Sequence, residues 1–162
     1  MGYFYPHNIH PYTECVKRME TLSGWADSQA FRIIIQDGFD LEGFIRNVAF
    51  REKDRCRFCY HERLMSTALM AKRGQFEGFS TTLLYSKFQN HEQIRSMGEQ
   101  VAESVGVCFY YEDFRVGWKE GITESKALGM YRQSYCGCIY SEKDRYYKPQ
   151  QRLQKPQSPH AG

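Results

Sequence analysis

The chain has 162 residues, of which 25% are charged, and its formal net charge is +3. This length is typical of one domain that buries roughly 70% of the surface exposed by its unfolded form. No apolar run approaches the ~18 residues that a membrane-spanning helix needs, so a membrane span is excluded. The small positive charge permits contact with nucleic acid but does not by itself indicate it, because many globular proteins carry as much.

The first residues, MGYFYPHNIHP, lack the basic segment followed by an apolar segment that marks a secretory signal. We therefore expect a cytoplasmic protein in a reducing compartment. In such a compartment the six cysteines are interpreted as metal ligands or redox thiols rather than as structural disulfides.

The first half of the chain alternates strand and helix patterns. The aromatic run at 2–5 predicts a short strand, and apolar residues three apart predict a helix over 12–28. FRIIIQ at 31–36 is a nearly continuous apolar run, which predicts a strand covered on both faces. A loop with a short helix follows over 37–50, and helical character returns over 56–72.

The second half continues this alternation. FEGFSTTLL at 76–84 predicts a strand that runs into a threonine-rich loop. Asn90 predicts the N-cap of a helix that stops at Gly106, and VCFYY at 107–111 predicts a fourth strand. The glycine- and lysine-rich segment that comes next predicts another helix. Residues 148–162 are rich in Pro, Gln and Lys and predict a disordered tail.

Strands that alternate with helices predict a single α/β domain over residues 1–147, built on a parallel sheet of Rossmann-like type. Ligands of such folds gather at the carboxyl ends of the strands. A parallel-sheet domain rarely opens with a strand on its first residues. We therefore expect that the first β–α unit is missing and that the domain is N-terminally incomplete.

Cys56 and Cys59 form a C-x-x-C at the predicted start of a helix. This spacing lets both sulfurs face one point, and the helix N-terminus is expected to lower the thiol pKa and to favour metal-binding thiolates. Four thiolates hold zinc or an iron–sulfur cluster. Two more ligands are then needed, either Cys136 and Cys138 or residues outside this chain. Two unrelated thiols and a thioredoxin-like redox pair are the alternatives.

Cys136 and Cys138 are separated only by Gly137. Two cysteines at this spacing close a small disulfide ring only with unusual backbone geometry, which glycine tolerates. A strained disulfide cycles readily, so these residues are either metal ligands or a redox dithiol. Cys15, on a helix face, and Cys108, in an apolar strand, are instead expected to be core residues.

Four segments resemble the QueH-type epoxyqueuosine reductases, the cobalamin-independent family: in chain order, RCRFCYHERL, STTLLYSKFQNHEQI, VCFYYEDFR and MYRQSYCGCIYSEKDRYY. The opening GYFYPHNIHP also resembles that family's second strand and the loop after it. The resemblance runs from about residue 2 to residue 147. It implies a fold of the nucleotide-binding α-hydrolase group. It also implies reduction of epoxyqueuosine to queuosine at the wobble position of certain tRNAs.

The resemblance implies site residues as well. The family binds a [4Fe–4S] cluster through a Cys-Cys pair near its N-terminus together with the C-x-x-C, which falls on Cys56 and Cys59. Its C-x-C, taken as a redox-active disulfide, falls on Cys136 and Cys138. The Cys-Cys pair has no counterpart here, so the chain offers two of the four cluster ligands. An inactive truncated copy is therefore an alternative interpretation.

Removing an epoxide oxygen to leave an alkene takes two electrons and two protons and releases water. We expect Cys136 and Cys138 to alternate between dithiol and disulfide beside the cluster, with an electron donor that the sequence does not identify. Protonation of the departing oxygen calls for a general acid. Asp113 follows a strand and is the candidate for that role or for auxiliary metal binding. A helix cap or an ion pair with Arg115 is the alternative.

Other polar residues are candidates for substrate contacts. Ser80, Thr81 and Thr82 follow a strand and suit either phosphate or cyclopentane hydroxyl binding, or capping. His10 and His61 are equally well interpreted as plain surface or loop residues. An aromatic and basic stretch suits an anticodon loop, because unstacked bases lie on aromatic rings while cations meet phosphates. It comprises Tyr131, Arg132, Tyr135, Tyr140, Lys143, Arg145, Tyr146 and Tyr147.

Three alternatives remain open. The aromatic and basic stretch is also typical of a solvated surface, because Glu142 and Asp144 cancel part of its charge. A zinc-binding, RNA-binding module without catalysis would use Cys56, Cys59, Cys136 and Cys138 as an all-cysteine site. A sulfur-inserting tRNA enzyme of the same fold group would need a glycine-rich pyrophosphate loop, which these residues lack.

Overall fold

The computed structural model describes residues 1–148, so the predicted tail lies outside the described residues except for Lys148. Strands and helices alternate along this part of the chain. They are β1 (Gly2–Phe4), α1 (Tyr12–Ser28), β2 (Ile33–Ile35), α2 (Leu41–Val48), α3 (Arg55–Arg73), β3 (Gly78–Phe79), α4 (His91–Val105), β4 (Cys108–Phe109), α5 (Trp118–Ala127) and α6 (Ile139–Tyr146). Single turns of 3₁₀ helix at Glu52–Asp54, Thr82–Tyr85 and Phe114–Gly117 link some of them. No helix in this described part is both long and apolar enough to cross a membrane.

The strands are parallel, as predicted, but they form two separate pairs. β1 pairs with β2, with Tyr3 opposite Ile34. β3 pairs with β4, with Phe79 opposite Phe109. Among the described residues these two pairs do not join into one sheet. The architecture of residues 1–148 is therefore a mixed α/β arrangement, mostly helical with short parallel strands, and this part of the chain has no continuous Rossmann-like sheet.

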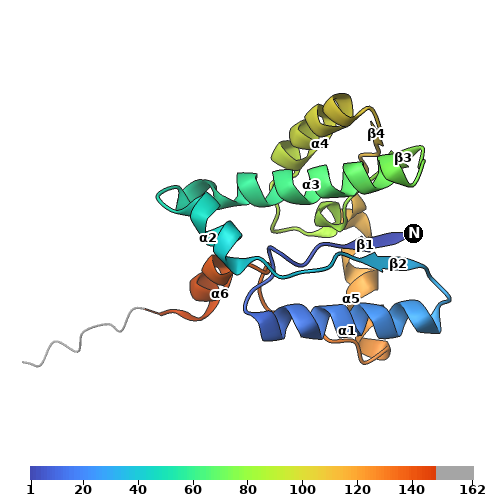
Figure 1. Cartoon of the computed structure of the whole chain (residues 1–162). Helices are drawn as coiled ribbons and strands as arrows, with labels where there is room; N and C mark the ends of the chain where they lie inside the picture. The colour runs from blue at the N-terminus through green and yellow to red at the C-terminus, as the bar shows by residue number, and fades with distance from the viewer. Residues whose placement is uncertain (149–162) are drawn as a thin grey trace, which may run out of the picture.

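The prediction that the second strand is covered on both faces is wrong. β2 has three residues, and the side chain of Ile35 is 38% exposed. Figure 1 shows α1 on one side of the β1–β2 pair, and α1 contacts β2. Because β2 is an edge strand in the described residues, its apolar side chains are only half covered. An apolar run alone does not distinguish this case from a central strand.

The main core lies between α3 and α4, which Figure 1 shows stacked against each other. Leu64 of α3 and Ile94 of α4 are fully buried. Gly98 is required in α4, because the ring of Phe109 lies 2.3 Å from the position that a Cβ atom would take. The buried members of this core are Tyr60, Leu64, Ala68, Ala71, Phe79, Leu84, Ile94, Val101, Val105 and Val107.

A second, smaller core brings α2, α3 and α6 together. It contains Phe44 and Val48 of α2 and Cys138, with Phe58 and Tyr140 packed against them. Figure 1 shows α6 directly beside α2, although these helices are far apart in the sequence. Cys138 is therefore part of a packed cluster that fixes the start of α6 against the rest of the molecule.

The sequence predicted the ends of α4 correctly. The side chain of Asn90 accepts a hydrogen bond from the backbone of Gln93, and Gly106 has a left-handed φ of 76° after the last turn.

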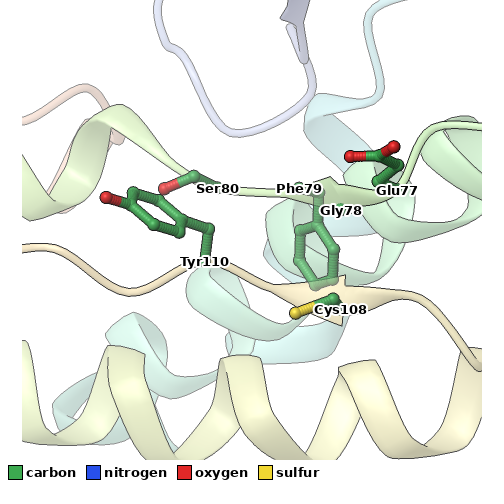
Figure 2. A pocket seen from close by; sticks show the side chains of 6 residues that line it. All are labelled: Glu77, Gly78, Phe79, Ser80, Cys108 and Tyr110. Carbon is green, nitrogen blue, oxygen red and sulfur yellow. The ribbon is translucent and has the colours of Figure 1, made fainter.

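Of the two cysteines predicted to be core residues, one is buried and the other is not. Cys15 is buried, as expected, whereas Cys108 is exposed. β4 has only two residues, and Cys108 lines the open hollow beside it (Figure 2).

Candidate functional site

Cys56 and Cys59, called here the CxxC pair, lie in the first turns of α3. The helix begins at Arg55, one residue before the predicted start. Cys56 is exposed and Cys59 is half-buried, and both are free thiols. The two residues are three positions apart on a helix, which places both on the same face.

Cys136 and Cys138, called here the CGC pair, precede α6. Cys138 occupies the N-cap position of α6 and is 9% exposed, whereas Cys136 is exposed. Both are free thiols. A helix at Ile139–Tyr146 was not predicted from the alternating charges and tyrosines of this segment. It gives the CGC pair a fixed place at a helix N-terminus, as α3 does for the CxxC pair.

Arg55 joins the beginnings of these two helices. Its Nη2 lies 2.6 Å from Oδ2 of Asp144 on α6. The guanidinium also lies over the ring of Tyr140, 5.6 Å from its centroid. Because Arg55 immediately precedes Cys56, these contacts hold the CxxC end of α3 beside α6.

The loop at residues 6–11 contacts both cysteine pairs. Nδ2 of Asn8 donates to the carbonyl oxygen of Cys59 at 3.3 Å. The backbone amide of His10 donates to the carbonyl oxygen of Gly137 at 2.8 Å. Nδ1 of His10 accepts from the backbone amide of Ile139 at 3.4 Å. The loop is therefore a common support for two segments that are far apart in the sequence.

The two histidines behave differently. His10 lies in a loop, as one of its two interpretations has it, but it is fully buried, so it is not a surface residue. Nothing in the local sequence shows this, because the contacts of its ring and backbone with Gly137 and Ile139 are long-range. His61 is exposed, and its Nδ1 lies 3.3 Å from Oε1 of Glu62, which agrees with its interpretation as a surface residue.

The thiols of both pairs lie close enough to affect each other's ionisation. Burial raises the pKa of the Cys56 thiol; Arg55 lowers it, and Cys59, Cys136 and Cys138 raise it further. Burial likewise raises the pKa of the Cys59 thiol, against the effect of Arg63 and a hydrogen bond from Asn8. The expected lowering of these pKa values by the helix N-terminus is therefore wrong for the free thiols, because desolvation is the larger effect.

A short hydrogen-bond chain reaches Cys136 from the α3–α4 core. Nε2 of Gln89 donates to Sγ of Cys136 at 3.3 Å. Oε1 of the same amide accepts from the hydroxyl of Tyr60 at 2.8 Å. Gln89 was not singled out from the sequence, since a glutamine before a helix cap carries no recognisable signal. It is a donor to the exposed sulfur of the CGC pair.

The surroundings of the CxxC pair partly fit a bound iron–sulfur cluster. Nε of Arg55 and Nε of Arg63 are buried without a hydrogen-bond partner among residues 1–148. Unsatisfied donors beside two thiols suit a group that presents acceptor atoms. Cys56 and Cys59 supply two thiol ligands, while a cluster needs four.

The four-cysteine zinc site does not form within the described residues. In residues 1–148 no three His, Cys, Asp or Glu side chains are arranged so that they could hold one metal ion. The CxxC pair and the CGC pair belong to the ends of two different helices, α3 and α6. They are neighbours, but they do not converge on one tetrahedral centre. The geometry therefore gives no support to the all-cysteine zinc module.

Asp113 forms an ion pair. Its carboxylate accepts from Arg115 at 2.7 Å and 2.6 Å, and it also caps the 3₁₀ turn through the backbone amide of Arg115. The hydrogen bonds from Arg115 lower the pKa of Asp113 to about 2. A carboxyl group with this pKa is ionised near neutral pH and has no proton to donate. The contacts favour the capping and ion-pair alternative over a general acid.

The three hydroxyl residues after β3 separate into different roles. Thr81 caps the following 3₁₀ turn by accepting from the backbone of Leu83, and Thr82 begins that turn. Ser80 has a buried hydroxyl with no partner among residues 1–148. It lines a hollow of about 390 Å³ that also contains Cys108 and Tyr110, where Figure 2 shows the hydroxyls of Ser80 and Tyr110 at the same end. None of these contacts involves the cysteine pairs.

Two members of the aromatic and basic stretch pack inside the protein, and the others lie at its surface. The hydroxyl of Tyr135 donates to the carbonyl oxygen of His10 at 2.6 Å, and Tyr140 packs on the second core. These two rings therefore hold the site together. The other six members are exposed: Tyr131, Arg132, Lys143, Arg145, Tyr146 and Tyr147.

Comparison with known proteins identifies the family. A family model described as epoxyqueuosine reductase QueH matches residues 1–144. A protein of Dehalococcoides mccartyi named epoxyqueuosine reductase QueH is 35% identical over 147 residues, covering 91% of this chain and 81% of that protein. A protein of Thermotoga maritima with the same name is 36% identical over 157 residues, covering 90% of this chain and 81% of that protein. The chain therefore belongs to the epoxyqueuosine reductase QueH family, a family of oxidoreductases.

Proposed function

We propose that this protein reduces epoxyqueuosine at the wobble position of tRNA to queuosine, with the CGC pair as its redox-active dithiol. One observation carries the proposal. In a chain of the QueH family, two cysteine pairs from distant parts of the sequence lie at the starts of α3 and α6, on the common support of the loop at residues 6–11.

The electron balance of the reaction suits a dithiol. Reduction of the epoxide breaks both carbon–oxygen bonds, leaves an alkene and releases water, and it consumes two electrons and two protons. Oxidation of Cys136 and Cys138 breaks two S–H bonds, forms one Sγ–Sγ bond and supplies two electrons and two protons. An external donor then returns the disulfide to the dithiol. Cys136 is the exposed residue of the pair, whereas Cys138 is buried.

The CxxC pair is proposed to contribute two ligands to a [4Fe–4S] cluster. When bound, such a cluster transfers electrons one at a time, which the dithiol alone does not do. A thiol that coordinates a metal loses its proton, so binding would offset the raised pKa values of Cys56 and Cys59. The buried donors of Arg55 and Arg63 would then face a negatively charged group.

The tRNA is proposed to bind over the exposed part of the aromatic and basic stretch. Tyr146 and Tyr147 are 57% and 64% exposed, and Tyr131 is 39% exposed. Exposed rings of this kind can stack on unpaired bases of an anticodon loop. Arg132 and Arg145 are exposed nearby in the sequence and suit phosphate contacts.

The proposal is tested with Cys136→Ser and Cys138→Ser in the holoenzyme. The substrate is tRNA that carries epoxyqueuosine, reduced methyl viologen is the electron source, and nucleosides are quantified by mass spectrometry after digestion. Both variants are expected to lose turnover while retaining the iron and acid-labile sulfide of the wild type. Full turnover in both variants would remove the dithiol from the mechanism.

Two other cysteines provide matched controls. Cys108 is exposed like Cys136, and Cys15 is buried like Cys138, but neither belongs to the site. Cys108→Ser and Cys15→Ser are therefore expected to keep turnover per folded molecule. Cys56→Ser and Cys59→Ser are expected to lower the iron and sulfide content. A colourless wild-type protein that contains one zinc would contradict the cluster.

A further inference from the structure

Glu14 and Arg18 of α1 form a buried ion pair. Nε of Arg18 lies 2.8 Å from Oε1 of Glu14, and the two side chains are only 10% and 8% exposed. The second carboxylate oxygen of Glu14 accepts from the hydroxyl of Tyr131 at 2.6 Å. Glu14 is therefore held from both sides, and it fixes the orientation of the guanidinium.

The remaining nitrogens of Arg18 bind the backbone of the CGC segment. Nη1 donates to the carbonyl oxygen of Cys136 at 2.9 Å, and Nη2 donates to the carbonyl oxygen of Tyr135 at 3.0 Å. The guanidinium also lies over the ring of Tyr135, 5.6 Å from its centroid. This fork of two parallel donors is a geometry that arginine provides and lysine does not.

Hydrogen bonds also hold the backbone of Gly137 and Cys138. The carbonyl oxygen of Gly137 accepts from His10, and that of Cys138 accepts from the hydroxyl of Ser141 at 2.7 Å. A Cβ atom on Gly137 would lie 3.2 Å from Nη1 of Arg18, so the segment is packed closely on the guanidinium. Every carbonyl from residue 135 to residue 138 is thus bonded, while both sulfurs are free thiols.

We infer that Arg18 is a positioning residue that stabilises the dithiol conformation of Cys136 and Cys138 and thereby raises the reduction potential of this pair. The inference rests on the proposed redox role of the CGC pair. A disulfide between two residues that are two positions apart closes a small ring, which needs unusual backbone geometry. Closing that ring would therefore change the backbone between residues 135 and 138 from the conformation that Arg18 holds. The two hydrogen bonds from Arg18 oppose that rearrangement. A pair that prefers the dithiol state is readily returned to it after each turnover.

The test compares Arg18→Gln with Arg95→Gln in the full-length protein. Arg95 also forms an i, i+4 pair, with Nε 2.9 Å from Oε1 of Glu99, and also lies over a tyrosine ring, but it is exposed on α4. Each protein is equilibrated in dithiothreitol redox buffers. The thiols at 136 and 138 are then alkylated and quantified by peptide mass spectrometry, which separates them from the other cysteines.

Arg18→Gln is expected to shift the equilibrium at least about tenfold toward the disulfide, which is about 30 mV toward a lower potential. Arg18→Lys is expected to shift it in the same direction by less, and Arg95→Gln is expected to leave it unchanged. An unchanged or raised potential in Arg18→Gln would overturn the inference, and so would an equal shift in Arg95→Gln.

A second variant covers the case in which Arg18→Gln does not fold. Tyr131→Phe removes only the hydroxyl that holds Glu14, and a smaller shift of the same sign is expected; no shift would count against the positioning role. The measurement uses neither tRNA nor turnover. If Cys136→Ser and Cys138→Ser keep turnover while Arg18→Gln lowers the potential, the proposed function fails and the positioning role of Arg18 stands.

Discussion

The backbone amide of His10 and the carbonyl oxygen of Gly137 are joined by a 2.8 Å hydrogen bond, so the loop before α1 holds the loop before α6. The ring of His10 adds a second contact, because its Nδ1 accepts from the amide of Ile139. One fully buried histidine therefore ties down both the CGC segment and the first residue of α6.

The stability of the protein should depend on pH through His10. Burial lowers the pKa of His10 below its ordinary value of 6.5. Between the two pKa values the unfolded state binds more protons, so the free energy of unfolding falls as the pH decreases. The fall begins near pH 6.5, has a slope of up to about 1.4 kcal/mol per pH unit, and ends at the folded-state pKa. Urea unfolding between pH 8 and pH 5 measures it.

The variant His10→Asn isolates this contribution, because asparagine does not titrate and its carbonyl can still accept a hydrogen bond. The difference in unfolding free energy between wild type and variant should shrink as the pH falls. His61→Asn, at an exposed position, is the control for replacing a histidine away from the buried site. A constant difference for His10→Asn at all pH values would contradict the prediction.

Gly137→Ala should destabilise the protein. Gly137 has a φ of +153°, which alanine rarely adopts, and a Cβ atom would meet Nη1 of Arg18 at 3.2 Å. We expect a loss of about 1–3 kcal/mol in the free energy of unfolding. Gly24→Ala is the matched control, since nothing lies within 4 Å of its Cβ position and it lies inside α1. That change should stabilise by about 0.5–1 kcal/mol, and equal effects at both sites would be contrary to expectation.

Leu64→Ala should be among the more destabilising changes in the core. Leu64 is completely buried between α3 and α4, so its truncation leaves a cavity and should lower the free energy of unfolding by about 2–5 kcal/mol. Leu69 lies on the same helix but is 41% exposed, and Leu69→Ala should cost much less. Chemical denaturation of the two variants gives the comparison, and similar losses would show that α3 packs differently.

Asp113→Asn should leave turnover and its pH dependence unchanged. The hydrogen bonds from Arg115 hold the pKa of Asp113 at about 2, so the side chain is a carboxylate throughout the working range. Turnover of tRNA that carries epoxyqueuosine, measured from pH 6 to pH 9, tests this. A large loss of turnover with unchanged folding would restore Asp113 as a proton donor.

The sequence predicted what local patterns determine. The limits of α1 agree with the apolar spacing over residues 12–28, and Asn90 and Gly106 mark the ends of α4, because caps and periodicity are properties of neighbouring residues. The strands are shorter than predicted. Alternating or continuous apolar residues fit an exposed edge as well as a central strand, and Cys108 was placed in the core for this reason.

The sequence predicts the cysteines of the candidate site, but it does not predict the residues that hold them in place. The spacing of Cys56, Cys59, Cys136 and Cys138 is visible in the sequence. The structure joins the segments that carry the two pairs through Arg55 and through the loop at residues 6–11. The buried roles of His10 and Arg18 depend on contacts with residues more than one hundred positions away. Neither periodicity nor spacing contains information about such contacts.

The loop at residues 6–11 touches both the carbonyl of Cys59 and the segment from Gly137 to Ile139. Undocking of this single loop would therefore release both cysteine pairs at once, and the segments that carry them would open as one cooperative unit rather than residue by residue. The backbone amides of His10 and Ile139 should then exchange with deuterium at closely similar rates.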